Sequence, residues 1–357
     1  MTPTGILVTG GAGFVGSALA LRARQAWPEA RVTAFDNLRR RGSELNLPRL
    51  REAGVQFVHG DIRSPADLAA LAHGLDLLVE CSAEPSVLAG YDGDPSYVVD
   101  TNLGGTVHCL ELARRAGAAV VFLSTSRVYP IATLNAIATT DGGTRCEIAP
   151  VQTLPGVSPA GISEDFPLAG ARSIYGATKL ASELLITEYR EAFGLRTLVN
   201  RCGVIAGPWQ MGKVDQGVFS LWMSRHLAGG TLTYNGWSGE GKQVRDLLHV
   251  DDLADLVCTQ VAGLDQFDGE TFNVGGGLGC SLSLQETTRL CQELTGRRIT
   301  ISPVPDVRTA DVKLYVTDNA RVTAATGWAP RRSPATVLAD IRDWMTAHAV
   351  DLRRAGV

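Results

Sequence analysis

The sequence predicts a doubly wound, mostly parallel α/β sheet followed by a smaller C-terminal α/β lobe. The chain has 357 residues, of which 45% are hydrophobic and 20% are charged, as in globular proteins that bury a sizeable core. In the first half, short β-rich runs alternate with amphipathic stretches, which is typical of parallel sheets with crossover helices. A glycine-rich turn follows the first run directly, at the kind of strand end where such sheets bind ligands.

The expected strands and helices alternate in order along the chain. Five β-rich runs are interpreted as strands: residues 6–8, 31–35, 57–59, 77–81 and 120–124. Three amphipathic stretches are interpreted as the helices between them: residues 16–25, 65–72 and 104–116. A helix that starts near Tyr175 and an apolar strand at residues 197–200 follow.

The later part of the chain has weaker periodicity. Residues 130–168 are rich in Thr, Gly, Pro and Ala, and a long loop of this kind in a compact domain is usually functional or mobile. Because it follows a predicted strand end, we expect that it can cover a site. We expect a sheet domain over residues 1–200, to which part of 242–270 returns, and a smaller lobe formed by residues 201–241 and 271–357.

Composition and charge argue against several classes of function. The formal net charge is −4, with acids and bases interleaved, so nucleic acid is not an expected partner. The N-terminal apolar run is too short for a signal peptide and no stretch has membrane-spanning length, which predicts a cytoplasmic protein without a membrane partner. The seven cysteines form no CxxC pair and the six histidines lack ligand spacing, so we expect no bound metal.

The turn after the first strand has the spacing of a dinucleotide-binding loop. Gly10, Gly13 and Gly16 form a GxxGxxG pattern, which permits a sharp turn, close approach of a pyrophosphate and tight packing of helix on strand. The helix start then offers unpaired N–H groups to the phosphates. Asp36, twenty residues after Gly16, can accept hydrogen bonds from the adenosine ribose. These features predict a Rossmann-type domain.

Charges after the second strand bear on the choice between NAD and NADP. Asp36 would repel a 2′-phosphate, whereas the arginines at positions 39–41 could attract one. Because the acid stands at the strand end and the arginines lie beyond it, we expect NAD. After the third strand, Asp61 and Ile62 could contact the adenine, although Asp61 is equally well explained as an acid at a helix N-terminus.

A second group of residues supplies proton-transfer chemistry. Tyr175 and Lys179 lie one turn apart on one face of the predicted helix. A free tyrosine has a pKa of about 10, and we expect the nearby ammonium and an oxidised nicotinamide to lower it. The same lysine can hold the nicotinamide ribose. Thr125 ends the fifth predicted strand, where its hydroxyl can bind a reacting oxygen and share its proton with Tyr175.

Together these residues resemble the extended short-chain dehydrogenase/reductase family of sugar-nucleotide epimerases and dehydratases, over nearly the whole chain. Residues 102–106 (Asn-Leu-Gly-Gly-Thr) are similar to the family's NxxGT, and residues 245–252 (Arg-Asp-Leu-Leu-His-Val-Asp-Asp) to its RDxxHVxD. The resemblance implies a Rossmann domain, a lobe that grips a nucleotide diphosphate, and oxidation of one sugar carbon by bound NAD. Apolar helix faces within 102–116 and 175–193 suggest a homodimer or homotetramer, as in the family.

Longer strings resemble one subgroup, the CDP-paratose 2-epimerases, also called CDP-tyvelose epimerases. These strings are residues 36–46, 81–86 and 200–213. Family 4,6-dehydratases carry an Asp-Glu pair after the catalytic threonine, but Ser126 and Arg127 stand here, which disfavours dehydration. UDP-sugar 4-epimerases usually carry an asparagine where this chain has Val204. The resemblance therefore implies a CDP-linked deoxyhexose as substrate.

The candidate site residues form three groups. The catalytic candidates are Tyr175, Lys179 and Thr125. The candidates for binding the cofactor are Gly10, Gly13, Phe14, Val15, Gly16, Asp36, Asn37, Arg39, Asp61, Ile62, Cys81, Ala83, Asn102, Tyr175 and Lys179. The candidates for binding the substrate are Thr125, Ser126, Lys213, Gln216, Gln243, Arg245 and Arg308, the two arginines being assigned to the diphosphate because their rigid forks suit phosphate oxygens.

Four functions remain open from the sequence. The first is epimerisation at C2, in which Tyr175 takes the proton of the 2-hydroxyl, hydride passes to NAD and returns to the opposite face. A 4-epimerase would use the same residues with the sugar seated differently. A net dehydrogenase or reductase would exchange free NAD(H). A non-catalytic NAD-binding scaffold would be expected to lack Tyr175 or Lys179, and both are present.

Overall fold

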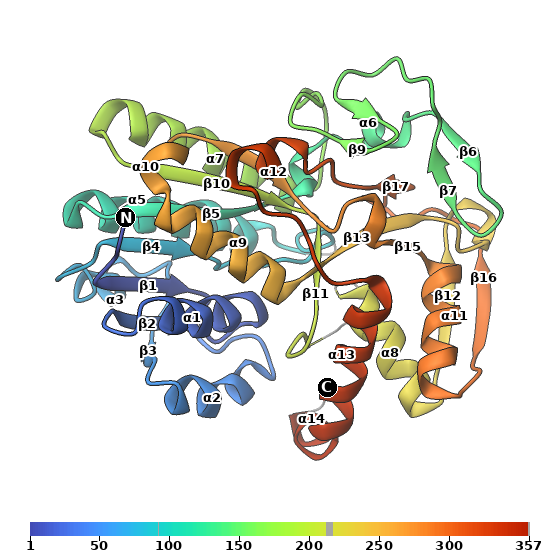
Figure 1. Cartoon of the computed structure of the whole chain (residues 1–357), viewed down its shortest axis with the longest axis horizontal. Helices are drawn as coiled ribbons and strands as arrows, with labels where there is room; N and C mark the ends of the chain where they lie inside the picture. Colours follow the sequence, from blue (N-terminus) through green and yellow to red (C-terminus); the bar gives the residue numbers. More distant parts are fainter. Residues whose placement is uncertain (92, 212–216, 356–357) are drawn as a thin grey trace.

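The computed structural model describes residues 1–91, 93–211 and 217–355. At its centre lies a parallel seven-stranded sheet in the order β14-β10-β5-β4-β1-β2-β3 (Figure 1). Its strands are β1 (Gly5–Thr9), β2 (Arg31–Asp36), β3 (Gln56–His59), β4 (Leu77–Glu80), β5 (Ala119–Thr125), β10 (Thr197–Cys202) and β14 (Thr271–Val274). The chain runs outward from β1 to β3 and then crosses to β4, so the strand order reverses beside β1. Ligands of α/β sheets bind at such a point, and the expected fold class is confirmed.

Helices cover both faces of this sheet because successive strand side chains point to opposite faces. In β1, Ile6 and Val8 pack on one face with α1 (Phe14–Ala26) and α9 (Val250–Ala262). Leu7 packs on the other face with α5 (Gly105–Ala116) and α7 (Ile174–Phe193). Shorter helices α2 (Leu47–Glu52), α3 (Pro65–Ala69), α4 (Ser96–Val99) and α10 (Leu264–Phe267) lie along the connections.

The start of α7 is set by its local sequence. The Ser173 hydroxyl accepts the Gly176 N–H at 3.1 Å and so caps the first turn. Gly194, with φ +65°, ends the helix in the left-handed conformation. The helix therefore begins one residue before Tyr175, directly beside the end of β5.

The smaller lobe is built around a second, four-stranded sheet. In it β13 (Val244–His249) pairs with β11 (Val204–Ala206), β15 (Ser281–Ser283) and β17 (Leu314–Tyr315). A parallel pair, β12 (Thr231–Asn235) and β16 (Thr300–Val304), lies beside it. The helices of the lobe are α8 (Val218–Ala228), α11 (Leu284–Thr295), α13 (Pro334–Ala347) and α14 (Ala349–Ala355), and they share a core of their own with these strands.

The lobe does not contain all of the segments that the sequence assigned to it. Strand β14 pairs with β10 in the central sheet. Val322 of α12 (Ala320–Thr326) and Trp328, which follows this helix, both belong to the core of the sheet domain. The assignment of residues 271–357 to the lobe as a whole was therefore wrong for these two elements. The four residues of β14 and the seven residues of α12 carry too little periodicity to reveal which core they join.

Residues 130–168 are more structured than the sequence indicated. They form α6 (Ile131–Asn135) and two small antiparallel ribbons, β6 (Thr139–Asp141) with β7 (Cys146–Ile148) and β8 (Val157–Ser158) with β9 (Gly161–Ile162). The Cys146 and Ile162 N–H groups bond to the lobe carbonyls of Lys242 and Val316. Among the described residues that line a cleft, none belongs to this segment. The expectation that it covers a site is not supported.

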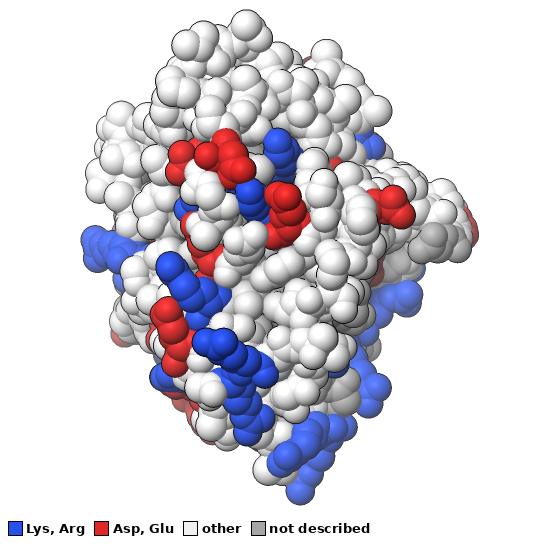
Figure 2. Space-filling view, turned by 90° about the vertical axis from the view of Figure 1, so that its right-hand side faces the viewer, with Lys and Arg blue, Asp and Glu red and all other residues white. Residues whose placement is uncertain are grey.

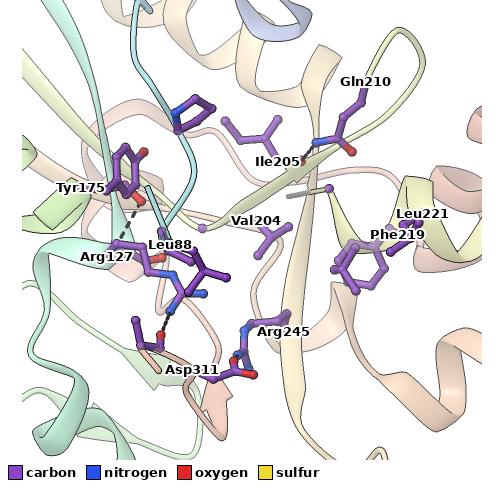
Figure 3. A pocket seen from close by; sticks show the side chains of 18 of the residues that line it. Leu88, Arg127, Tyr175, Val204, Ile205, Gln210, Phe219, Leu221, Arg245 and Asp311 are labelled. Atoms are coloured by element: carbon purple, nitrogen blue, oxygen red, sulfur yellow. Dashed lines mark hydrogen bonds and ion pairs between the residues drawn. The ribbon is translucent and has the colours of Figure 1, made fainter. Parts of the chain in front are cut away.

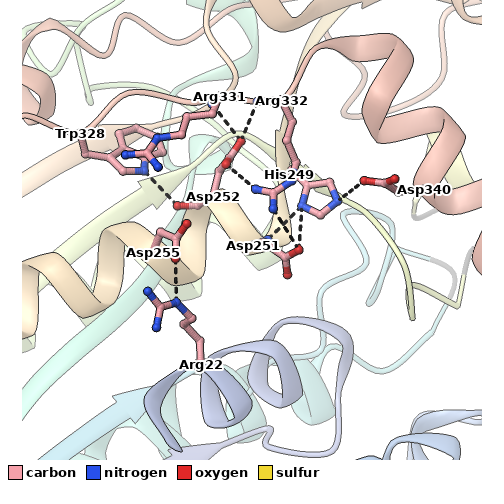
Figure 4. A network of polar contacts seen from close by, with 9 residues as sticks. All are labelled: Arg22, His249, Asp251, Asp252, Asp255, Trp328, Arg331, Arg332 and Asp340. Atoms are coloured by element: carbon pink, nitrogen blue, oxygen red, sulfur yellow. Dashed lines mark hydrogen bonds and ion pairs between the residues drawn. The ribbon is translucent and has the colours of Figure 1, made fainter. Parts of the chain in front are cut away.

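A buried polar network fixes the C-terminal segment to α9 (Figure 4). Asp252, 2% exposed, accepts the N–H groups of Arg331 and Arg332 at 3.1 Å each and also bonds the Arg332 guanidinium. The Trp328 indole donates to the Asp252 carbonyl oxygen at 3.0 Å. The acid at the end of the RDxxHVxD string thus has a structural role.

On the face of the molecule that carries the lobe, acidic and basic side chains are mixed near the middle and basic ones predominate toward the lower end (Figure 2). This face therefore carries both signs of charge. Within the described part of the chain, no helix combines the length and hydrophobicity that crossing a membrane requires.

Candidate active site

Two adjoining clefts lie at the carboxyl ends of the central strands. The glycine-loop cleft, about 410 Å³, is bounded by the loops after β1, β2 and β4. The lobe cleft, about 510 Å³, is bounded by the ends of β5 and β10 and by lobe segments. Phe14, Val15, Cys81 and Ala83 line both. The candidate cofactor residues that line the glycine-loop cleft are Gly10, Gly13, Phe14, Val15, Gly16, Asp36, Asn37, Arg39, Ile62, Cys81 and Ala83.

The glycine loop has no room for larger side chains. Gly10 has φ +62°, and a Cβ at this position would lie 3.0 Å from the Cys81 carbonyl oxygen. A Cβ at Gly16 would lie 2.1 Å from the Gly10 carbonyl oxygen. Gly13 precedes α1, and among the described residues no side chain caps this helix start. The backbone here fits a pyrophosphate held by N–H groups at a helix N-terminus.

Asp36 ends β2 in the wall of the same cleft. Its carboxylate accepts the N–H groups of Ala12 at 3.2 Å and Leu38 at 2.7 Å. Burial raises the pKa of Asp36, and these backbone hydrogen bonds oppose the rise. A carboxylate has about four acceptor sites, so two N–H groups leave it able to accept ribose hydroxyls.

Cationic and aromatic side chains meet at the rim of this cleft. The Arg39 guanidinium lies over the Tyr97 ring, 3.9 Å from its centroid. Asp61 pairs with Arg63 at 2.8 Å and accepts a hydrogen bond from Asn37 at 2.9 Å. The hydrogen bond from Arg63 holds the pKa of Asp61 well below its usual range. Asp61 precedes the N-cap of α3, so it is not an acid of that helix, and its contact with adenine stays a prediction.

Tyr175 stands in the first turn of α7 and faces the lobe cleft beside Thr125. Burial raises the pKa of Tyr175 to about 12, although the Thr125 hydroxyl and the charge of Arg127 lower it. The expectation that Lys179 brings this pKa down is therefore not met by the protein alone, because desolvation of the phenolate outweighs the neighbouring charges.

Lys179 is buried and directs its charge elsewhere. Its side chain is 2% exposed, and its ammonium lies 3.8 Å from the centroid of the Phe122 ring. Burial lowers the pKa of Lys179, whereas the carboxyl groups of Glu80 and Glu183 raise it. Lys179 also lines the lobe cleft, where it can reach a nicotinamide ribose.

Asn102 lies behind the wall of the clefts. It is 1% exposed; its side-chain oxygen accepts the Glu84 N–H at 2.8 Å and its amide donates to Thr178 at 3.2 Å. Asn102 is not among the described residues that line the two clefts. The structure thus places Asn102 as a tie between the loop after β4 and α7, and not in the wall where a contact with the cofactor was expected.

Four arginines line the lobe cleft among the described residues, and three of them are Arg127, Arg245 and Arg308. Arg245 on β13 pairs with Asp311 at 3.1 Å and donates to the Val244 carbonyl oxygen at 2.8 Å. Burial lowers the pKa of Arg245 to about 10, and Asp311 opposes this. Figure 3 shows Arg127 between Tyr175 and Asp311. Arg308 lines the cleft from an exposed position. Asp311 therefore orients Arg245.

The remaining substrate candidates are distributed unevenly. Ser126 and Gln243 line the lobe cleft; the Gln243 amide donates to the Asn235 carbonyl oxygen at 2.8 Å. Lys213 and Gln216 lie outside the described residues. Away from Tyr175, the cleft is walled by the apolar side chains of Val204, Phe219 and Leu221 (Figure 3). Trp222 also lines it.

Several lining residues carried no sequence signal. Trp209 and Tyr97 line the glycine-loop cleft, and Arg225 lines the lobe cleft. Each belongs to an element that folds onto the clefts from a distant part of the chain. Arg127 did have a signal, since it stands two residues after Thr125 where family dehydratases carry an acid.

Comparison with known proteins agrees with this geometry. The model of the NAD dependent epimerase/dehydratase family matches residues 6–275. The chain is 31% identical to CDP-paratose 2-epimerase of Salmonella typhi over 96% of this chain and 99% of that protein. It is 30% identical to a dTDP-glucose 4,6-dehydratase of Streptomyces antibioticus, over 95% and 91% of the two chains.

A solved structure extends the comparison to the cofactor. The DesIV double mutant, a dTDP-glucose 4,6-dehydratase from Streptomyces venezuelae with NAD and DAU bound, superposes with a TM-score of 0.80 at 29% identity, covering 98% of this chain and 99% of that one. The match of fold thus extends over nearly the whole chain. The protein belongs to the NAD dependent epimerase/dehydratase family.

Proposed function

We propose that this enzyme is an epimerase that inverts C2 of CDP-paratose to give CDP-tyvelose. Its cofactor is NAD, as in the solved relative. Relatives named for nucleotide sugars support a nucleotide-sugar substrate, and the relative from Salmonella typhi favours C2 as the reacting carbon. The observation that carries the proposal is that Thr125 and Tyr175 line one cleft, in which the two residues after the threonine are Ser126 and Arg127 and not acids.

The residues divide the work between the two clefts. Gly10, Gly13 and Gly16 hold the pyrophosphate of NAD on backbone N–H groups, and Asp36 accepts the ribose hydroxyls. When bound there, NAD would supply the acceptor and donor of hydride for the sugar carbon, so that no net oxidation would result. Lys179 holds the nicotinamide ribose from the wall that separates the clefts.

Proton transfer falls to Tyr175. As phenolate it takes the proton of the sugar 2-hydroxyl as the C2–H bond breaks, and it returns this proton to the oxygen when C2–H re-forms on the opposite face. Thr125 donates to the reacting oxygen and keeps it within reach of Tyr175. Because burial raises the pKa of Tyr175 to about 12, the phenolate needs a further positive charge nearby, which an oxidised nicotinamide provides.

The absence of a suitable acid favours epimerisation over dehydration. A dehydratase has to protonate the hydroxyl that leaves, and the family's dehydratases use an Asp-Glu pair after the threonine for this. Among the described residues of the lobe cleft, Asp311 is the single carboxylate, and it is paired with Arg245. An ion-paired carboxylate is a poor proton donor near neutral pH.

The site has to neutralise the negative charge of the substrate's diphosphate and still let the sugar move. Arg245 and Arg308 lie where they can grip a diphosphate. With the diphosphate fixed, the 2-keto sugar can turn and present its other face to the cofactor. The wall formed by Val204 and Phe219 offers this sugar few fixed hydrogen bonds, which suits such a rotation.

The test is proton NMR of the purified enzyme with CDP-paratose in deuterated water, without added NAD. We expect conversion to CDP-tyvelose without deuterium at C2, because the hydride returns from retained cofactor. The matched control is Tyr175→Phe, with which the spectrum of CDP-paratose should stay unchanged. Inversion of UDP-glucose at C4 without conversion of CDP-paratose would replace this proposal by a 4-epimerase, and stoichiometric release of NADH would replace it by a net dehydrogenase.

A further inference from the structure

Arg127 is placed beside the catalytic helix by its backbone. It lies in the short helix η3 (Ser126–Val128), and its N–H donates to the Thr125 hydroxyl oxygen at 3.2 Å. Its carbonyl oxygen packs on Gly176 so closely that a Cβ there would lie 2.1 Å away. Arg127 and Tyr175 line the same cleft. Residue 127 therefore stands next to the place where the sugar reacts in the proposed function.

The guanidinium of Arg127 keeps most of its donors free. Its Nη1 donates to the Ala310 carbonyl oxygen at 3.1 Å. A guanidinium has five N–H groups, and Nε and Nη2 of Arg127 have no hydrogen-bond partner among the described residues. Figure 3 shows this side chain between Tyr175 and Asp311, within the lobe cleft. Arg127 can therefore bind a ligand through the fork formed by Nε and Nη2 without breaking its contact with Ala310.

Arg245, by contrast, is largely occupied by the protein itself. Its Nη1 donates to the Val244 carbonyl oxygen at 2.8 Å. Its Nη2 donates to the Asp311 carboxylate at 3.1 Å and also to the Val312 carbonyl oxygen. Nε is the nitrogen of Arg245 that remains without a partner among the described residues. Of these two arginines, Arg127 therefore has more donors to offer to a ligand.

The charges of the lobe cleft favour an anion near these two arginines. Among the described residues that line the cleft, four are arginines and one, Asp311, is a carboxylate. Burial lowers the pKa of both Arg127 and Arg245, and the charge of Arg127 lowers that of Arg245 further, although Asp311 opposes these effects. Two cations that repel each other in a poorly solvated cleft are stabilised by an anion that both can reach.

We propose that Arg127 binds the β-phosphate of the nucleotide sugar, the phosphate that carries the sugar, through Nε and Nη2. The inference deepens the proposed function and rests on a nucleotide sugar being the substrate. The planar fork of a guanidinium matches two oxygens of one phosphate, and such charge-assisted pairs are the strong ones. A carboxylate at position 127 would repel this phosphate, so the residue that disfavours dehydration also favours this way of binding.

The position of this phosphate bears on which carbon of the sugar reacts. In a nucleotide sugar the β-phosphate is joined through an oxygen to C1, and C1 is bonded to C2, whereas C4 lies across the ring. Because Arg127 stands beside Tyr175, a phosphate bound there lies close to the proton carrier, which fits reaction at C2. The bound phosphate also gives the 2-keto sugar a fixed point about which to turn.

The experiment is isothermal titration calorimetry of the NAD-loaded enzyme with CDP and with CMP, which lacks the β-phosphate. We expect the wild type to bind CDP about tenfold or more tighter than CMP. Arg127→Gln should weaken the binding of CDP about tenfold or more and that of CMP less than about threefold. Arg127→Lys keeps the charge but loses the fork and should recover part of the affinity for CDP. The control Arg289→Gln removes an arginine of α11 whose side chain is 70% exposed, and it should bind both nucleotides like the wild type.

The proposal is overturned if Arg127→Gln weakens CDP and CMP by the same factor or leaves the affinity for CDP unchanged. If far-ultraviolet circular dichroism shows that Arg127→Gln does not fold, the wild type decides: equal affinity for CDP and CMP overturns the proposal, and tighter binding of CDP supports it. UDP and UMP are titrated in the same way. Tighter binding of UDP than of CDP would contradict the cytidine nucleotide of the proposed function, and the comparison of UDP with UMP would then test Arg127. Because none of these ligands contains a sugar, a failure of the C2 assignment in the NMR test leaves this outcome unaffected.

Discussion

Glu80 at the end of β4 is a buried acid whose ionisation should make the enzyme less stable as pH rises. It is 1% exposed; its Oε1 accepts the Thr106 hydroxyl at 2.6 Å, and its Oε2 is buried with no partner among the described residues. Burial raises the pKa of Glu80 from 4.5 to about 7, although Lys179 and the Thr106 bond lower it. The perturbation is Glu80→Gln, which keeps the shape and the acceptor for Thr106 but cannot titrate.

The sign and size of the expected change in stability follow from the linkage between proton binding and folding. Between pH 4.5 and pH 7 the folded protein holds the proton of Glu80 more tightly than the unfolded chain, so stability falls as pH rises through this window. Each unit of pKa shift corresponds to about 1.4 kcal/mol, so complete ionisation of Glu80 lowers the free energy of unfolding by about 3 kcal/mol. Between pH 5 and pH 8 the decrease is about 2.5 kcal/mol. Glu80→Gln lacks this decrease.

The assay is urea denaturation, followed by tryptophan fluorescence, of wild type and Glu80→Gln after removal of bound nucleotide. The free energy of unfolding of the variant minus that of the wild type should increase by about 2.5 kcal/mol from pH 5 to pH 8. The control Glu52→Gln alters an exposed acid at the end of α2 and should give a constant difference. A difference for Glu80→Gln that is constant across this range would refute the reasoning.

Three other substitutions probe the site and the fold. Tyr175→Phe should slow epimerisation by about 10²- to 10⁴-fold while NAD binding, measured by fluorescence quenching, is retained; a loss below tenfold would contradict the proton-transfer role. Gly176→Ala places a Cβ 2.1 Å from the Arg127 carbonyl oxygen and should lower stability by about 1–3 kcal/mol, seen as a lower melting temperature; an unchanged melting temperature would contradict the close packing of η3 on α7. Asp252→Asn should cost about 2 kcal/mol or more in urea denaturation, because the buried acid bonds a guanidinium and two N–H groups. The control Asp255→Asn breaks only a partly exposed pair with Arg22 (Figure 4) and should cost less than about 1 kcal/mol; equal costs for the two variants would refute the role given to Asp252.

Much of the sheet domain could be predicted because its signals are local. Six of the seven central strands and the helix that carries Tyr175 fall where the alternation of apolar runs placed them. Strand β14 was missed as a member of this sheet because its pairing with β10 spans about seventy residues of chain. The same reason accounts for α12, whose Val322 reaches the sheet core from the C-terminal part.

The site was predictable in its residue types more than in its charges. The glycine spacing places Gly10, Gly13 and Gly16 in the wall of one cleft, since a backbone that must approach a ligand excludes side chains. What Lys179 contacts could not be predicted, because Glu80 and Glu183 reach it from β4 and from the next turn of α7. Electrostatic partners depend on burial and on tertiary neighbours, which one sequence does not display.

The placement of Lys179 also links the opening prediction to the chemistry. A lysine that lies over Phe122 beside two acids is well placed to hold a ribose, because its position is fixed before the cofactor binds. Glu80 raises the pKa of Lys179, so Glu80→Gln should lower the pKa of this lysine and make its ammonium lose its proton at a lower pH. Binding of NAD by Glu80→Gln, measured by fluorescence quenching, should therefore weaken at a lower pH than in the wild type; identical pH profiles would show that Glu80 does not act on Lys179.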